Sequence, residues 1–65
     1  MDANNHIGRP ILIVEDSKAQ QTVLAALVEN FGFTPHVVSS AGEALEAVRV
    51  MLFAAIMMDI RMPDM

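Results

Sequence analysis

The sequence predicts an α/β fold in which three short parallel strands alternate with two helices. Two apolar runs, residues 11–14 and 54–58, indicate strands that are buried on both faces, as parallel strands usually are. The two stretches 18–31 and 41–50 carry apolar residues at spacings of three and four, which is typical of helices. Because single helices separate the strands, the strands are expected to pair in parallel through right-handed crossovers.

Local signals place the elements of the first half. Pro10 suits the beginning of the first strand, where a missing N–H is least harmful. The following helix is expected over residues 18–31, with Asp16 or Ser17 capping its start and Gly32 ending it in a left-handed conformation. The inward stripe expected for this helix consists of Val23, Leu24, Leu27, Val28 and Phe31.

The second half continues the alternation. A short strand is expected over residues 34–38, and Pro35 places it at an edge of the sheet. Ser40 and Glu43 have the spacing of a capping box, so the second helix is expected to begin there and to run to about residue 50. Its inward residues are expected to be Ala44, Leu45 and Val48.

Composition limits the function classes. The 65 residues carry a net charge of −4 and no Cys, which argues against phosphate-backbone binding to nucleic acids and excludes disulfides and thiolate metal sites. Residues 1–9 are expected to be a disordered leader without the plan of a signal peptide. The longest apolar run, 50–58, is far shorter than the roughly 20 residues that span a bilayer, so no membrane contact is expected and a cytoplasmic location is predicted.

Acidic residues follow two of the predicted strands. Glu15 and Asp16 come directly after the first strand, and Asp59 comes directly after the third. Ligands of parallel α/β sheets bind beyond the carboxyl ends of the strands, so these side chains are expected to meet if the two strands are neighbours. Three clustered carboxylates need a cation, a shared proton or a basic partner, and Mg²⁺ suits oxygen ligands. The alternative is that these carboxylates only cap the first helix and end the third strand.

Several segments together resemble a known family. They are Val14-Glu15-Asp16, Gln20-Gln21, Gly42-Glu43-Ala44-Leu45 and Met58-Asp59-Ile60-Arg61-Met62-Pro63. In this order they resemble the receiver domain of two-component response regulators, with most similarity to receivers of hybrid sensor histidine kinases. The resemblance covers residues 10–65 and implies a flavodoxin-like fold with strand order 2-1-3. Residues 10–65 are expected to form the N-terminal part of such a domain, truncated before its later strands and helices.

The resemblance also implies a function. Asp59 would be the phosphoacceptor, taking a phosphoryl group from a partner histidine kinase or phosphotransfer protein. Glu15, Asp16 and Asp59, together with the backbone carbonyl of Arg61, would hold Mg²⁺, with Glu15 acting through water. The Lys and the Ser or Thr that follow in a complete receiver are not among the 65 residues. Phosphotransfer by these residues is therefore predicted from the resemblance alone.

A second hypothesis is an interaction fragment that keeps the architecture without phosphotransfer. Residues 54–58 would form an apolar edge strand that pairs with the same strand of a second copy, giving a dimer. A phosphatase with an Asp nucleophile fits poorly, because such enzymes place a second Asp where Arg61 stands. The pair Gln20-Gln21 is interpreted as a solvated or partner-facing patch, and His6 and His36 as surface residues rather than metal ligands.

Overall fold

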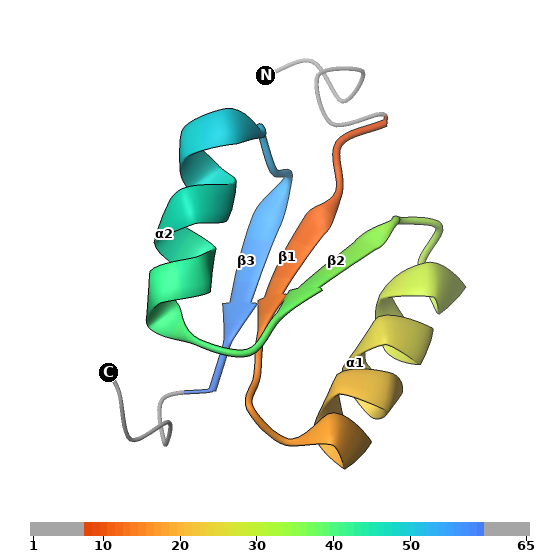
Figure 1. Ribbon diagram of the computed structural model, residues 1–65. Coiled ribbons are helices and arrows are strands. Elements are labelled where there is room, and N and C mark those ends of the chain that lie inside the picture. The colour runs from red at the N-terminus through yellow and green to blue at the C-terminus, as the bar shows by residue number, and fades with distance from the viewer. Residues whose placement is uncertain (1–7, 60–65) are drawn as a thin grey trace.

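The structure, a computed structural model, describes residues 8–59 and consists of one three-stranded parallel sheet with two helices (Figure 1). The elements follow in the order β1 (Ile11–Val14), α1 (Lys18–Asn30), β2 (Pro35–Val38), α2 (Ala41–Val50) and β3 (Ala55–Met58). The spatial order of the strands is β2-β1-β3. The predicted α/β class, the parallel pairing and the order 2-1-3 are therefore confirmed. The expected leader lies almost wholly outside the described residues.

The three strands pair without a stagger between them. Ile11 lies opposite Pro35 in β2 and opposite Ala55 in β3, and the pairing continues without a bulge to Val14. Pro35 begins the edge strand β2, where its missing N–H interrupts no ladder, as the sequence predicts. Because the strands are not staggered, all three end at the same edge of the sheet. The residues that follow the strands are therefore brought close together.

The central strand β1 organises the core. Leu12, Ile13 and Val14 have no exposed surface, and consecutive residues of the strand point to opposite faces. Two buried clusters result. Leu12 and Val14 pack with residues of β2 and α2, whereas Ile11 and Ile13 pack with Val28 of α1. The two helices therefore cover opposite faces of the sheet, with α1 on the β2 side and α2 on the β3 side in Figure 1.

Both helices begin and end where local chemistry requires. The Ser17 hydroxyl accepts a hydrogen bond from the N–H of Gln20 at 3.3 Å, and the Ser40 hydroxyl accepts one from Glu43 at 3.2 Å. These bonds satisfy N–H groups that have no partner within the helix. Gly32 follows α1 with a φ of +88°, so the predicted left-handed ending is confirmed. At 13 and 10 residues, α1 and α2 each fall short of what a membrane-crossing helix requires.

The predicted inward stripe of α1 is only partly correct. Val28 is buried and Leu24 packs against the same cluster, but Val23, Leu27 and Phe31 are 61%, 44% and 74% exposed. The helix packs against β1 and β2 through the side that carries Leu24, Ala25 and Val28. Only one side of a helix can meet a single sheet, so the larger residues on its flank stay in contact with solvent.

The prediction for α2 is also partly wrong. Ala44 is buried as expected, and so is Ala47, which the pattern did not single out. Leu45 and Val48 are 65% and 41% exposed instead of facing inward. Two small alanines let the helix approach β1 closely, and this contact turns the larger side chains towards β3. There they flank an apolar groove of about 280 Å³, lined in part by Leu12, Ala44, Leu45, Val48, Ile56 and Met58.

The burial pattern predicts different responses to the same small deletion in β1 and β3. Ile13→Val removes one methylene from the fully buried centre of the sheet and should lower the free energy of unfolding by about 0.5–1.5 kcal/mol. Ile56→Val is the matched control, because Ile56 is 51% exposed, and it should cost less than about 0.5 kcal/mol. Urea unfolding followed by circular dichroism measures both. Equal losses would contradict the assignment of β1 as the centre of the core.

Candidate functional site

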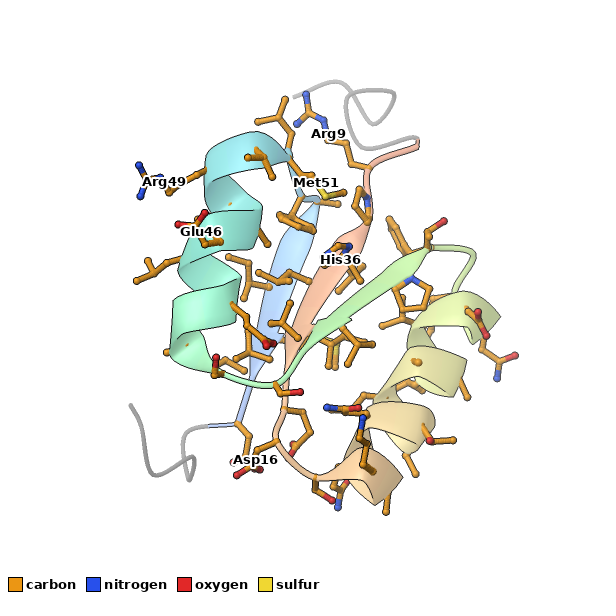
Figure 2. All side chains as sticks on the ribbon, viewed as in Figure 1. Arg9, Asp16, His36, Glu46, Arg49 and Met51 are labelled. Carbon is orange, nitrogen blue, oxygen red and sulfur yellow. The ribbon has the colours of Figure 1, made fainter. Side chains whose placement is uncertain are left out.

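The site consists of three acidic side chains at the carboxyl edge of the sheet. Glu15 directly follows β1, Asp59 directly follows β3, and Asp16 is one residue further along the first loop. The N–H of Asp59 donates to the carbonyl of Val14 at 3.2 Å, which extends the β1–β3 pairing to this point. The three side chains can each offer a carboxylate oxygen within 4.8 Å of the others. Figure 2 shows Asp16 at this edge, whereas Arg9 and Met51 lie towards the opposite end of the sheet.

The three carboxylates differ in their access to solvent. Glu15 is buried, with 3% of its surface exposed, whereas Asp59 is partly buried and Asp16 is exposed. A buried carboxylate needs hydrogen-bond donors, and one oxygen of Glu15 accepts from the N–H of Ser17 at 3.1 Å. Glu15 therefore forms the back of the site. Asp16 and Asp59 form the side from which an ion or a reactant can approach.

The donor chemistry of this group fits a hard divalent cation. Three like charges within 4.8 Å repel one another, and a cation among them converts that repulsion into attraction. Mg²⁺ takes oxygen ligands at about 2.0–2.1 Å and keeps several waters, so one or two direct carboxylates are sufficient. The exposed Asp16 has the freedom to adjust its side chain to such an ion. Among residues 8–59, this group is the one set of three acidic, His or Cys side chains close enough to share an ion.

The structure brings together the three side chains that the sequence predicts to meet. Glu15, Asp16 and Asp59 lie in one group, while Arg61, whose carbonyl was expected to join them, lies outside the described residues. Their proximity does not test their roles, so the metal ligands and the phosphoacceptor stay predictions. His36, expected at the surface, is partly buried, and its ring meets that of Phe53 edge to face with centroids 5.6 Å apart.

Gln21 contacts the acidic loop, a role that the sequence analysis does not assign to it. The sequence predicts that Gln20 and Gln21 form a solvated or partner-facing patch, whereas the side-chain amide of Gln21 donates to the carbonyl of Glu15 at 2.7 Å and to the hydroxyl of Ser39 at 3.3 Å. Gln20 is exposed. A signal for Gln21 did exist. It lies three residues before Leu24, on the side of α1 that faces the sheet, where a polar side chain needs a partner.

Comparisons with known proteins agree with this geometry. The response regulator receiver domain family matches residues 11–65. The transcriptional regulatory protein ZraR of Escherichia coli K12 is 35% identical over 60 residues, which are 92% of this chain and 14% of that protein. Probable histidine kinase 6 of Oryza sativa subsp. japonica is 38% identical over 60 residues, or 91% of this chain and 6% of the kinase. The chain thus spans a small part of these relatives. No solved structure matches it.

The acidic group should destabilise the chain when no divalent ion is present. Asp16→Asn removes one of three clustered charges and should raise the free energy of unfolding in EDTA by about 1 kcal/mol, the size of a unit-charge interaction at this range in water. Glu46→Gln changes the net charge equally on the outer surface of α2, where Glu46 pairs with Arg49 at 3.6 Å, and should change little. Urea unfolding compares the two. A loss of stability in Asp16→Asn would show that repulsion does not dominate at this edge.

Proposed function

The chain belongs to the response regulator receiver family, and on that premise we propose that it accepts a phosphoryl group on Asp59 from a partner histidine kinase. The family supports a phosphoacceptor module of two-component signalling. The identities of the acceptor residue, the metal ion and the phosphoryl donor are what we propose beyond the family. The observation that carries them is the grouping of Asp59 with Glu15 and Asp16 at the carboxyl edge of the sheet.

Asp59 has the properties that an acceptor at this edge requires. Its backbone is held by the hydrogen bond from its N–H to Val14, which fixes the residue relative to β1. Its side chain is only partly buried, so a phosphorylated partner can reach it. Glu15 is buried, with 3% of its surface exposed, so a partner can reach it less easily than Asp59. Asp16 is accessible but lies in the loop before α1 rather than at the end of a paired strand.

The proposed step is a direct transfer between two side chains. A carboxylate oxygen of Asp59 attacks the phosphorus of a phosphohistidine on the partner, and an O–P bond forms. The N–P bond breaks, and its electron pair returns to the imidazole nitrogen of the partner. The product is an acyl phosphate on Asp59, and the step needs no further reactant. The partner histidine kinase is inferred from the family rather than from any surface of this chain.

Glu15, Asp16 and Asp59 would hold Mg²⁺ in this proposal, with the carbonyl of Arg61 as an additional ligand. When bound, the ion supplies the positive charge that lets the anionic phosphoryl group approach anionic carboxylates. The chain contributes the arrangement of the ligands. Asp16 lies in the loop after β1 and Asp59 lies at the end of β3, and the Ser17 N–H orients Glu15 behind them.

A second candidate function is self-association through β3. Among the described residues β3 is an edge strand, and its Ile56 and Met58 are 51% and 43% exposed beside the apolar groove under α2. We propose that a second copy pairs with this strand. A two-fold axis perpendicular to the sheet would place both α2 helices on the same face. The exposed Leu45 and Val48 of both copies would then flank the paired strands.

Charge favours antiparallel pairing over parallel pairing in such a dimer. Parallel alignment would bring two acidic groups together, because Asp59 ends β3 in each copy. Antiparallel alignment places the two groups at opposite ends of the paired strands, separated by about 3.3 Å for each strand residue. The apolar side chains at the centre of β3 then meet one another. This arrangement is compatible with an acidic site that stays accessible.

Phosphorylation of Asp59 can be tested directly. After incubation with Mg²⁺ and phosphoramidate, the intact mass of the chain should rise by one phosphoryl group, and hydroxylamine should remove it, as expected for an acyl phosphate. Asp59→Asn should abolish the gain, because the amide is not a nucleophile of this kind. Glu46→Gln, remote from the site, should retain it. A gain that persists in Asp59→Asn would place the acceptor elsewhere, and no gain in the folded wild type would refute the proposal for this chain.

Self-association has an equally direct test. Light scattering should give a mass that approaches two chains as the concentration rises through the micromolar range. Ile56→Lys should keep the chain monomeric, because it puts a charge at the centre of the edge strand. Val23→Lys makes the same kind of change at a residue of α1 that is 61% exposed, and it should leave the association unchanged. The mass of a single chain at all concentrations would refute pairing through β3.

A further inference from the structure

We propose that Gln21 is a positioning residue that holds the Glu15–Asp16 loop in the geometry Mg²⁺ requires, and so sets a preference for Mg²⁺ over the larger Ca²⁺. This inference rests on the metal role proposed above for the acidic group. It assigns a specific task to a side chain that is neither a metal ligand nor a phosphoacceptor. The observation that carries it is a bridge between two loops made by one amide group.

The bridge consists of two hydrogen bonds from the side-chain nitrogen of Gln21. One goes to the carbonyl oxygen of Glu15 at 2.7 Å and is partly buried, and the other goes to the hydroxyl of Ser39 at 3.3 Å. A Gln amide nitrogen carries two hydrogens, so it can serve both acceptors at once. Glu15 follows β1 and Ser39 follows β2. The amide therefore ties together the loops at the carboxyl ends of two neighbouring strands.

The bond to Glu15 bears directly on Asp16. The carbonyl that Gln21 holds belongs to the peptide group that joins Glu15 to Asp16, so rotation of that group would displace the Asp16 side chain. On the other side of the loop, the Glu15 carboxylate accepts from the N–H of Ser17. Asp16 itself is exposed, so little packing restrains it. The position of its carboxylate therefore depends on a backbone that Gln21 and Ser17 hold from either side.

The other end of the bridge is well anchored. The N–H of Ser39 donates to the Glu43 carboxylate at 2.7 Å, and the Ser40 hydroxyl caps α2 by accepting from the N–H of Glu43. This reciprocal cap ties Ser39 to the start of α2. Gln21 thus attaches the Glu15–Asp16 loop to the segment that joins β2 to the start of α2. A flexible anchor would not restrain the loop, whereas a capped helix start does.

A restrained loop should matter more for Mg²⁺ than for Ca²⁺. Mg²⁺ requires nearly ideal octahedral geometry at 2.0–2.1 Å, whereas Ca²⁺ accepts six to eight oxygens at 2.3–2.6 Å in flexible arrangements. If the Glu15–Asp16 peptide loses its restraint, the loop has to be ordered when Mg²⁺ binds, and this ordering lowers the Mg²⁺ affinity. Ca²⁺ requires less ordering of the loop, so its affinity should fall less. The ratio of the two affinities therefore reports positioning. A purely structural hydrogen bond would change stability without changing that ratio.

The test compares metal binding by the 65-residue chain and its Gln21→Met variant, which keeps the side-chain length and removes both donors. Calorimetric titration with MgCl₂ should give an Mg²⁺ Kd about three- to tenfold higher in the variant, an effect that is expected mainly from loss of the 2.7 Å bond to the Glu15 carbonyl. The Ca²⁺ Kd should change by less than about twofold, because of the looser geometry that this ion accepts. Gln20→Met is the matched control, since its side chain is exposed on the same helix and both affinities should stay as in the wild type.

Ser39→Ala gives a second variant that leaves α1 intact. It removes only the 3.3 Å arm of the bridge and should shift the Mg²⁺ affinity in the same direction by a smaller factor. An unchanged ratio of the Mg²⁺ and Ca²⁺ affinities in both Gln21→Met and Ser39→Ala, whether or not stability falls, would overturn the positioning role alone. A folded wild type that binds neither ion would overturn the metal role and this inference together. The two failures are therefore distinguishable.

Discussion

The rest of the structure depends on one constraint, the parallel and unstaggered pairing of β1 with β2 and β3. Val14 lies opposite both Val38 and Met58, so the three strands end together. This pairing places β1 at the centre of the sheet, where α1 and α2 cover its two faces and its four residues form the centre of the core. It also delivers Glu15 and Asp59 to one edge, where their charges repel. The strand pairing that stabilises the fold is thus also what brings these negative charges together.

Much of the fold could be predicted because its elements are set by local chemistry. Apolar runs specify β1 and β3, while Ser17, Ser40 and Gly32 fix helix ends through bonds to nearby backbone or through a positive φ. The orientation of the helices could not be predicted in the same way. Periodicity finds an apolar stripe, but it does not show which part of that stripe meets the sheet. On α2 the small Ala47 is buried and Leu45 is exposed, because close approach to β1 favours the smaller residue.

The candidate site shows the same division between local and tertiary information. The acidic residues could be placed from the sequence alone, since each follows a predicted strand and parallel strands end at one edge. The position of Gln21 on α1 indicates that its side chain needs a partner, but the partners themselves could not be identified, because one of them is a backbone carbonyl, which has no signature in the sequence. Its other partner, Ser39, is 18 residues away and becomes a neighbour only when β2 pairs with β1. A side chain that positions ligands is therefore harder to recognise than the ligands themselves.

The two proposed activities use different parts of β3 and still depend on each other. The ion would bind beyond the carboxyl end of the strand, whereas a second copy would pair along its edge, where Ile56 and Met58 are exposed. The ion and the second copy both need the folded sheet, and folded domains of about 60 residues are in general marginally stable. By mass action, binding of the ion therefore increases the folded population that can pair, and pairing increases the folded population that can bind the ion. Because such linkage is reciprocal, Mg²⁺ would promote pairing and pairing would promote Mg²⁺ binding without any contact between the two sites.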